Sequence, residues 1–145
     1  MKIMFVCTGN TCRSAMAEAI FKLMVEDEIE VYSSGIAAEN GRHPSENALN
    51  VCKSHGIDLS SHKATCFKDS NIEDMDLILT FEMYQKYKLH IYYPDLEIFT
   101  IKEFINEYPF DINDPFGGDY KVYDACFNEI CRVLKKVKAI LEQYD

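Results

Sequence analysis

Residues 2–14 read KIMFVCTGNTCRS, an unbroken apolar run that passes directly into a polar loop containing glycine. The run from Lys2 to Cys7 is short and rich in Ile, Phe and Val, which is typical of a strand buried on both faces. From Ser14 to Met24, apolar residues recur at helical spacing. A buried strand followed at once by a helix favours an α/β fold built on a parallel sheet.

The rest of the chain repeats this alternation of strand and helix. Further apolar runs predict strands at residues 29–34, 76–80 and 96–101, and helical patterns cover residues 44–55 and 82–87. The longest helical pattern has its apolar positions at Tyr123, Cys126, Phe127, Ile130, Val133, Leu134, Val137, Ile140, Leu141 and Tyr144. We therefore expect one domain over residues 1–145, in three layers, with a four-stranded parallel sheet and helices on both faces. Its ligand should bind beyond the carboxyl ends of the strands.

Composition argues against several classes of protein. Of the 145 residues, 48% are hydrophobic and 27% are charged, which fits neither a disordered nor a fibrous chain. The net charge of −9 disfavours a nucleic-acid partner, because that binding depends on clustered Lys and Arg. No run in the sequence approaches the roughly 18 apolar residues that indicate a membrane span. We expect a cytoplasmic protein, without a nucleic-acid or membrane partner, whose six cysteines are thiols.

The loop after the first strand has the composition of an oxyanion site. Gly9 and Asn10 permit a tight turn, and free N–H groups where the next helix begins can converge on an anion. A thiolate at Cys7 would be stabilised by that helix terminus and by Arg13, whose planar fork suits two phosphoryl oxygens. Ser14 can donate a hydrogen bond to the same sulfur. The phosphate-binding residues expected here are Thr8, Gly9, Asn10, Thr11, Cys12 and Ser14.

A second loop, NDPFGG at residues 113–118, offers a proton donor. A thiol that attacks phosphorus needs an acid to protonate the departing group, and Asp114 is the candidate. Phe116 would form one wall of the site, and the glycines behind it would let the loop close over a substrate. The same sequence is also ordinary turn chemistry, in which such an aspartate only bonds its own backbone.

Together, the C-x5-R-S loop and the Asp-Pro loop closely resemble those of the low-molecular-weight protein tyrosine phosphatase family. The resemblance covers nearly the whole chain and implies a four-stranded parallel sheet and a phosphocysteine intermediate. It implies that Cys7 is the nucleophile, Arg13 the transition-state ligand and Asp114 the acid and then the base. It also implies a hydrogen-bonded set that supports the loop, formed by Asn10, Ser14, Ser33 and His62. No metal or organic cofactor is needed, and the partners would be phosphorylated proteins.

Two positions bear on the substrate. Eukaryotic members that act on phosphotyrosine carry two tyrosines after Asp-Pro, whereas Phe116 and two glycines stand here, which resembles the bacterial branch. In that branch, arginine phosphatases are similar to this chain at Thr11, where tyrosine-directed members usually have a branched apolar residue. A hydroxyl there can accept a hydrogen bond from a guanidinium, whereas an Ile methyl would pack against a phenol ring. We predict a phosphoarginine phosphatase, with phosphotyrosine as the alternative.

Other interpretations stay open. A phosphate-binding module with the same fold would bind phosphopeptides without turnover. An arsenate reductase would share the loop but needs further redox cysteines, and residues 81–93 contain none. Cys12 is either a small core residue or a partner that forms a reversible disulfide with Cys7. Four tyrosines either line the rim of the site or are half-buried at a strand edge, namely Tyr84, Tyr87, Tyr92 and Tyr93.

Overall fold

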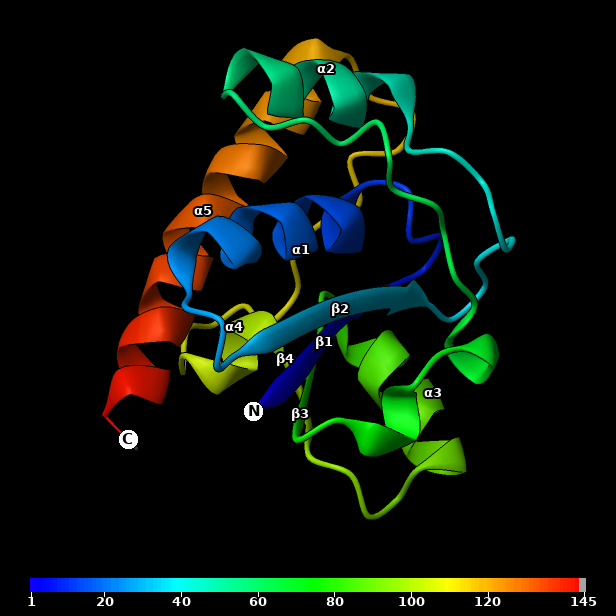
Figure 1. Ribbon diagram of the computed structural model, residues 1–145, viewed down its shortest axis with the longest axis vertical. Coiled ribbons are helices and arrows are strands. Elements are labelled where there is room, and N and C mark those ends of the chain that lie inside the picture. Colours follow the sequence, from blue (N-terminus) through cyan, green and yellow to red (C-terminus); the bar gives the residue numbers. More distant parts are fainter. Residues whose placement is uncertain (144–145) are drawn as a thin grey trace.

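A computed structural model describes residues 1–143 and places a four-stranded sheet at the centre of the molecule (Figure 1). The strands are β1 (Lys2–Cys7), β2 (Glu30–Gly35), β3 (Leu77–Thr80) and β4 (Ile98–Thr100), all parallel, in the order β2-β1-β3-β4. The order reverses between β1 and β3, and ligands of such sheets bind beyond the carboxyl ends of the strands at this point. The α/β fold expected from the sequence is confirmed.

Helices cover both faces of the sheet. One face carries α1 (Arg13–Met24), α2 (Glu46–Ser54) and α5 (Tyr120–Glu142), and the other carries α3 (Met83–Tyr92) with two short 3-10 helices, η1 (Phe67–Asp69) and η2 (Ile72–Asp74). Alternate residues of β1 pack against the helices on the two faces of the sheet, because successive side chains of a strand point to opposite faces. Ile3 and Phe5 join the larger core cluster, whereas Met4 and Val6 join the smaller one.

Several element boundaries differ from the sequence prediction, mostly by one or two residues. The helix expected from Pro44 begins at Glu46, because the Ser45 side chain caps it by accepting a hydrogen bond from the Ala48 N–H. The strand expected to reach Ile101 ends at Thr100, which caps α4 (Ile101–Phe104). The helix expected at residues 82–87 extends to Tyr92. Tyr144, the last position of the long helical pattern, lies outside the described residues.

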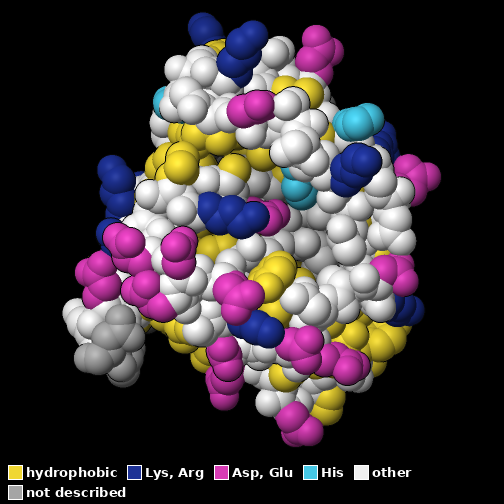
Figure 2. Space-filling model, viewed as in Figure 1, with side chains coloured by type: hydrophobic (Ala, Val, Ile, Leu, Met, Phe, Trp, Pro, Cys, Tyr) yellow, Lys and Arg dark blue, Asp and Glu magenta, His cyan; other side chains and the backbone are white. Residues whose placement is uncertain are grey.

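A groove of about 780 Å³ lies between α1, β2 and residues 56–71, and is visible as a hollow in Figure 2. Glu18, Ser33 and His62 form part of its lining. None of the helices within residues 1–143 combines the length and the apolar character needed to span a bilayer.

A cluster of ion pairs fastens the segment after α4 to α5. The Glu107 carboxylate accepts hydrogen bonds from Arg132 at 2.7 and 2.8 Å and from Lys136 at 3.0 Å. These hydrogen bonds lower the pKa of Glu107 from its ordinary 4.5 to about 2. The ionised form is thus favoured in the folded state, and Glu107 contributes to stability wherever the unfolded chain would also be ionised.

Glu107→Gln is expected to lower the free energy of unfolding at pH 7 by about 0.5–1 kcal/mol, the usual range for partly exposed ion pairs. Because the folded pKa is depressed, the contribution of Glu107 is complete above about pH 4.5 and is lost as the pH falls towards 2. Urea unfolding of both proteins at pH 7 and pH 2.5 measures this. Glu39→Gln, on an 82% exposed side chain, is the matched control. An equal difference at both pH values would contradict the prediction.

Candidate active site

The loop from Cys7 to Ser14 lies at the carboxyl edge of the sheet, between the last residue of β1 and the first turn of α1. The left-handed conformation that the turn needs is adopted by Asn10, with φ 56°, and not by Gly9. Gly35, at the end of β2, passes so close that a Cβ there would lie 2.5 Å from the Thr8 carbonyl oxygen. The conformation of the loop is therefore fixed by its turn at Asn10 and by close packing against the end of β2.

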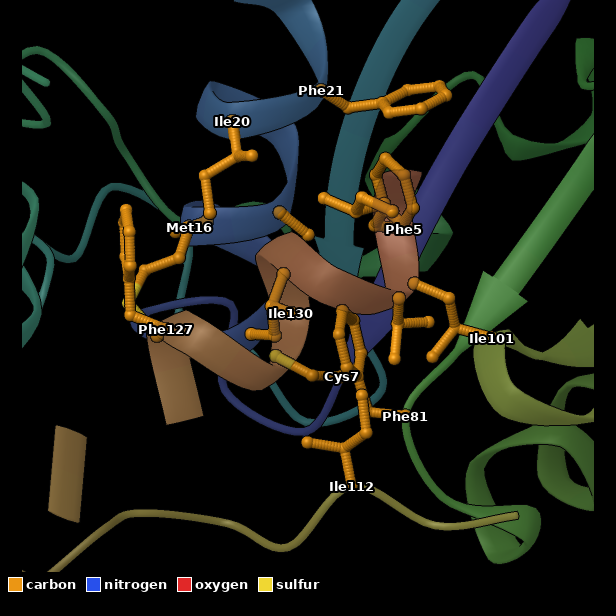
Figure 3. Packing of buried hydrophobic residues seen from close by; sticks show 14 of the residues in the cluster. Phe5, Cys7, Met16, Ile20, Phe21, Phe81, Ile101, Ile112, Phe127 and Ile130 are labelled. Atoms are coloured by element: carbon orange, nitrogen blue, oxygen red, sulfur yellow. The ribbon is translucent and has the colours of Figure 1, made fainter. Parts of the chain in front are cut away.

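Cys7 is buried at the inner end of this loop, against the larger core cluster. Figure 3 shows it among the buried side chains of that cluster, which include Phe81, Ile112 and Ile130. The Cys7 Sγ lies 2.9 Å from the Ser14 Oγ, as the sequence predicted. No side chain caps the N-terminus of α1 within the described chain, so the amide groups of its first turn are available to a bound anion.

The Arg13 side chain is also buried, with 1% of it exposed. Its Nη1 donates to Glu82 Oε1 at 2.6 Å and to the Ile112 carbonyl at 2.8 Å. Burial opposes the guanidinium charge, but Cys7, Asp114 and Glu82 outweigh that effect and raise the pKa of Arg13. Its Nε is the one buried side-chain nitrogen or oxygen without a hydrogen-bond partner among residues 1–143.

That unpaired Nε is informative. A buried donor left unpaired costs about 1–3 kcal/mol, and native proteins usually satisfy such groups. An oxyanion cradled by the loop would supply the acceptor. The sequence did not point to Glu82, whose carboxylate accepts a hydrogen bond from the guanidinium, because Glu82 lies 69 residues further along the chain.

The Asp-Pro loop reaches the same place. Asp114 Oδ2 lies 3.5 Å from Arg13 Nη2, and Oδ1 accepts from the Phe116 N–H at 3.0 Å. The aspartate therefore makes the ordinary turn bond and also lies beside the candidate site. Phe116 is 82% exposed.

The two glycines of this loop serve a tight turn. Gly117 has φ 83°, and a Cβ on Gly118 would lie 2.7 Å from the Val122 side chain. The Gly118 N–H donates to the Pro115 carbonyl at 2.9 Å, which closes the turn ahead of α5.

The four residues expected to support the loop come together around Asn10. Its Nδ2 donates to Ser14 Oγ at 2.7 Å and to Ser33 Oγ at 3.0 Å, and its carbonyl lies 2.7 Å from His62 Nε2. The structure adds Glu18, whose carboxylate accepts from Ser33 at 2.5 Å. No sequence motif includes Glu18, although this residue lies one helical turn after Ser14, on the same side of α1.

Cys12 lies close to both loops. Its Sγ is 3.9 Å from Asp114 Oδ1, and all six cysteines are free thiols. Burial, followed by the nearby charges of Cys7 and Asp114, raises the pKa of the Cys12 thiol well above its ordinary value. Cys12 is therefore protonated at neutral pH and is a poor nucleophile.

Thr8 connects the loop to α3. Its hydroxyl forms a hydrogen bond with the Tyr84 hydroxyl and accepts another from Gln85 Nε2 at 3.2 Å. Tyr84 is thus a rim residue, which was one of the two interpretations of the sequence. Thr11 is half-buried in the same loop, and a Cβ on Gly9 would lie 3.6 Å from its hydroxyl.

Comparisons with known proteins agree with this site. A family model described as low molecular weight phosphotyrosine protein phosphatase matches residues 2–144. A protein-arginine-phosphatase of Geobacillus stearothermophilus is 34% identical over 143 residues, which are 97% of this chain and 96% of that protein. The low molecular weight protein-tyrosine-phosphatase PtpB of Staphylococcus haemolyticus is 36% identical over 141 residues, 95% of this chain and 98% of that protein.

A solved structure of a related phosphatase has the same fold. A structure of the YwlE arginine phosphatase, a cysteine-to-serine mutant with a phosphorylated active-site serine, superposes with a TM-score of 0.91 at 31% identity. The match covers 98% of this chain and 96% of that one. The chain belongs to the low-molecular-weight phosphotyrosine protein phosphatase family, and it is a cysteine-dependent protein phosphatase.

Proposed function

We propose that Cys7, Arg13 and Asp114 carry the reaction of this phosphatase, and that its substrate is phosphoarginine in proteins. One observation carries the proposal: the Cys7 thiol, the unpaired Arg13 Nε and the Asp114 carboxylate meet at one loop. The free state of all six thiols supports a reducing compartment, and we infer that the chain acts in the cytoplasm. We also infer that it acts as a single domain.

In the first step, the Cys7 thiolate attacks phosphorus and forms a sulfur–phosphorus bond as the bond from phosphorus to the substrate nitrogen breaks. Asp114, in its acid form, gives its proton to that nitrogen, so the arginine side chain leaves intact. In the second step, the Asp114 carboxylate takes a proton from a water molecule whose oxygen attacks phosphorus. Inorganic phosphate leaves, and the Cys7 thiolate is regenerated with a hydrogen bond from Ser14.

Arg13 stabilises the charge that develops on the phosphoryl oxygens. Glu82 and the Ile112 carbonyl both accept from Nη1, which leaves the unpaired Nε, together with Nη2 at 3.5 Å from Asp114 Oδ2, for the substrate. Donors fixed in advance need no reorganisation during the reaction, which is why such groups make large contributions. The phosphorylated serine of the YwlE mutant supports a covalent intermediate at the equivalent position.

The choice of substrate rests on Thr11 and on the relatives named arginine phosphatases. The Thr11 hydroxyl can accept a hydrogen bond from a guanidinium or order a water molecule beside the phosphorus–nitrogen bond. Phosphotyrosine is the second candidate. The PtpB relative is named a tyrosine phosphatase, and the exposed rings of Tyr84 and Phe116 are suited to contact a phenol.

Thr11→Ile is expected to lower the ratio of kcat/KM for phosphoarginine over phosphotyrosine by about 10–100-fold, because the hydroxyl is lost and an apolar branch is gained. Steady-state kinetics on matched peptides that differ only in the phosphorylated residue give this ratio for the native chain and the variant. Thr11→Ser, which keeps the hydroxyl, is the control and should retain the native ratio. A native preference for phosphotyrosine that the Ile variant leaves unchanged would overturn the phosphoarginine assignment.

A further inference from the structure

Helix α3 exposes a row of apolar side chains on one face. Tyr84 is 48% exposed, Tyr87 59% and Ile91 78%, and Lys88 is also exposed between them. The spacing i, i+3, i+4, i+7 places these four residues on one side of the helix, while Leu89 packs into the smaller core. We refer to these four residues as the α3 stripe.

The α3 stripe begins at the phosphate loop. The Tyr84 hydroxyl bonds the Thr8 hydroxyl, and Gln85, the next residue of α3, donates to that same oxygen at 3.2 Å. The helix starts at the carboxyl end of β3, which pairs with β1, and Cys7 is the last residue of β1. One end of the row therefore lies at the rim of the candidate site, and the other end lies two helical turns away along the side of the molecule.

From this continuity we propose that the α3 stripe binds the extended segment of the substrate protein next to its phosphorylated residue. The inference rests on the proposed function, because it assumes that the phosphorylated side chain enters the loop beside Tyr84. Seven residues of helix separate Tyr84 from Ile91, which is about 10 Å at a rise of 1.5 Å per residue. An extended chain covers that length in three or four residues at about 3.3 Å each.

The chemistry of the occupant follows from the stripe. An apolar side chain three or four residues from the phosphorylated residue would pack on Ile91 and Tyr87. An acidic side chain between the two would lie near Lys88. A segment of this kind carries its own specificity, independent of the phosphoryl group that the loop binds.

The test compares two substrates with two variants. One substrate is a phosphoarginine peptide long enough to place a leucine four residues from the phosphorylated residue, and the other is p-nitrophenyl phosphate, which is too short to extend from the loop to Tyr87 and Ile91. For Tyr87→Ser/Ile91→Ser, the KM for the peptide is expected to rise about tenfold, equivalent to about 1.4 kcal/mol, with kcat unchanged. Both constants for p-nitrophenyl phosphate should stay at native values.

Leu23→Ser is the matched control, because Leu23 is 73% exposed near the far end of α1. It should leave both substrates unaffected. Equal KM values for the peptide in the native chain and the double variant would overturn the α3 stripe as a docking surface. The proposal would also be overturned if sedimentation showed a dimeric native chain and a monomeric double variant with unchanged KM for the peptide. The α3 stripe would then be a contact between two copies of the chain.

These outcomes separate the two proposals. Failure of the native chain to hydrolyse either substrate would count against the proposed function. Failure of the peptide comparison, with hydrolysis of the small substrate intact, would count against the α3 stripe alone. A melting temperature equal to that of the native chain shows that the double variant is folded.

Discussion

Cys7→Ser is expected to lower kcat by about 10⁴-fold or more, the order of loss seen when a covalent nucleophile is removed. A serine hydroxyl is a far weaker nucleophile than a thiolate unless a base activates it. The Ser14 hydroxyl, 2.9 Å from Cys7 Sγ, is no base. Steady-state hydrolysis of a phosphorylated peptide, with the variant at high concentration, measures the loss.

The fold should tolerate this change. Cys7 is buried, and a serine there keeps a hydrogen-bonding partner in Ser14, so the melting temperature should fall by only a few degrees. Cys66→Ser, at a half-buried free thiol outside the loop, is the matched control and should retain full activity. Turnover by Cys7→Ser within about tenfold of native would remove the cysteine mechanism.

Arg13→Lys is expected to lower kcat/KM by about 10³-fold or more, since losing a single transition-state donor costs about 10²–10³-fold and more than one is lost here. The native guanidinium uses Nη1 for Glu82 and Ile112, while the unpaired Nε and the Nη2 that lies 3.5 Å from Asp114 are available to the phosphoryl oxygens. A lysine has one nitrogen, which would be attracted to the half-buried Glu82 carboxylate and could not also bind two oxygens.

Lysine is the informative replacement at this position, because it keeps a positive charge beside Glu82 and so limits the destabilisation that an uncompensated carboxylate would cause. Arg132→Lys, at a surface arginine paired with Glu107, is the control and should keep native kcat/KM. Single-turnover kinetics with the native chain and both variants separate binding from chemistry. An Arg13→Lys enzyme with a native chemical rate would show that the fork geometry is not used.

Local patterns of sequence were sufficient for the layers of this fold. The run from Lys2 to Cys7 is β1 as predicted, because a strand buried on both faces has few polar residues and its limits are easily seen. The short elements were harder. The ends of β4 and the start of α2 depend on the side-chain caps of Thr100 and Ser45, which a periodicity of apolar residues does not register.

The candidate site also has one part that the sequence predicts and another part that depends on the tertiary structure. Cys7, Arg13 and Ser14 lie within eight residues, so the turn between one strand and one helix brings them together without help from the rest of the chain. From the sequence, Asp114 is a candidate acid because of its loop and because of the family resemblance, but neither places it next to the phosphate loop. Its place beside Arg13, at 3.5 Å, depends on the path of the chain from β4 through α4 to the Asp-Pro loop.

By itself, the sequence determined the class of fold, the phosphate loop and the family, because each of these depends on residues adjacent in the chain or on a fixed period. Only the tertiary structure decided which side chains hold the loop in place and what lies around its mouth. Glu82 reaches Arg13 across 69 residues, and Tyr84 reaches Thr8 across 76. Such contacts are set by strand order and register, which bring the carboxyl ends of β1 and β3 side by side. No local pattern contains that information, because pairing between distant strands is a property of the whole sheet.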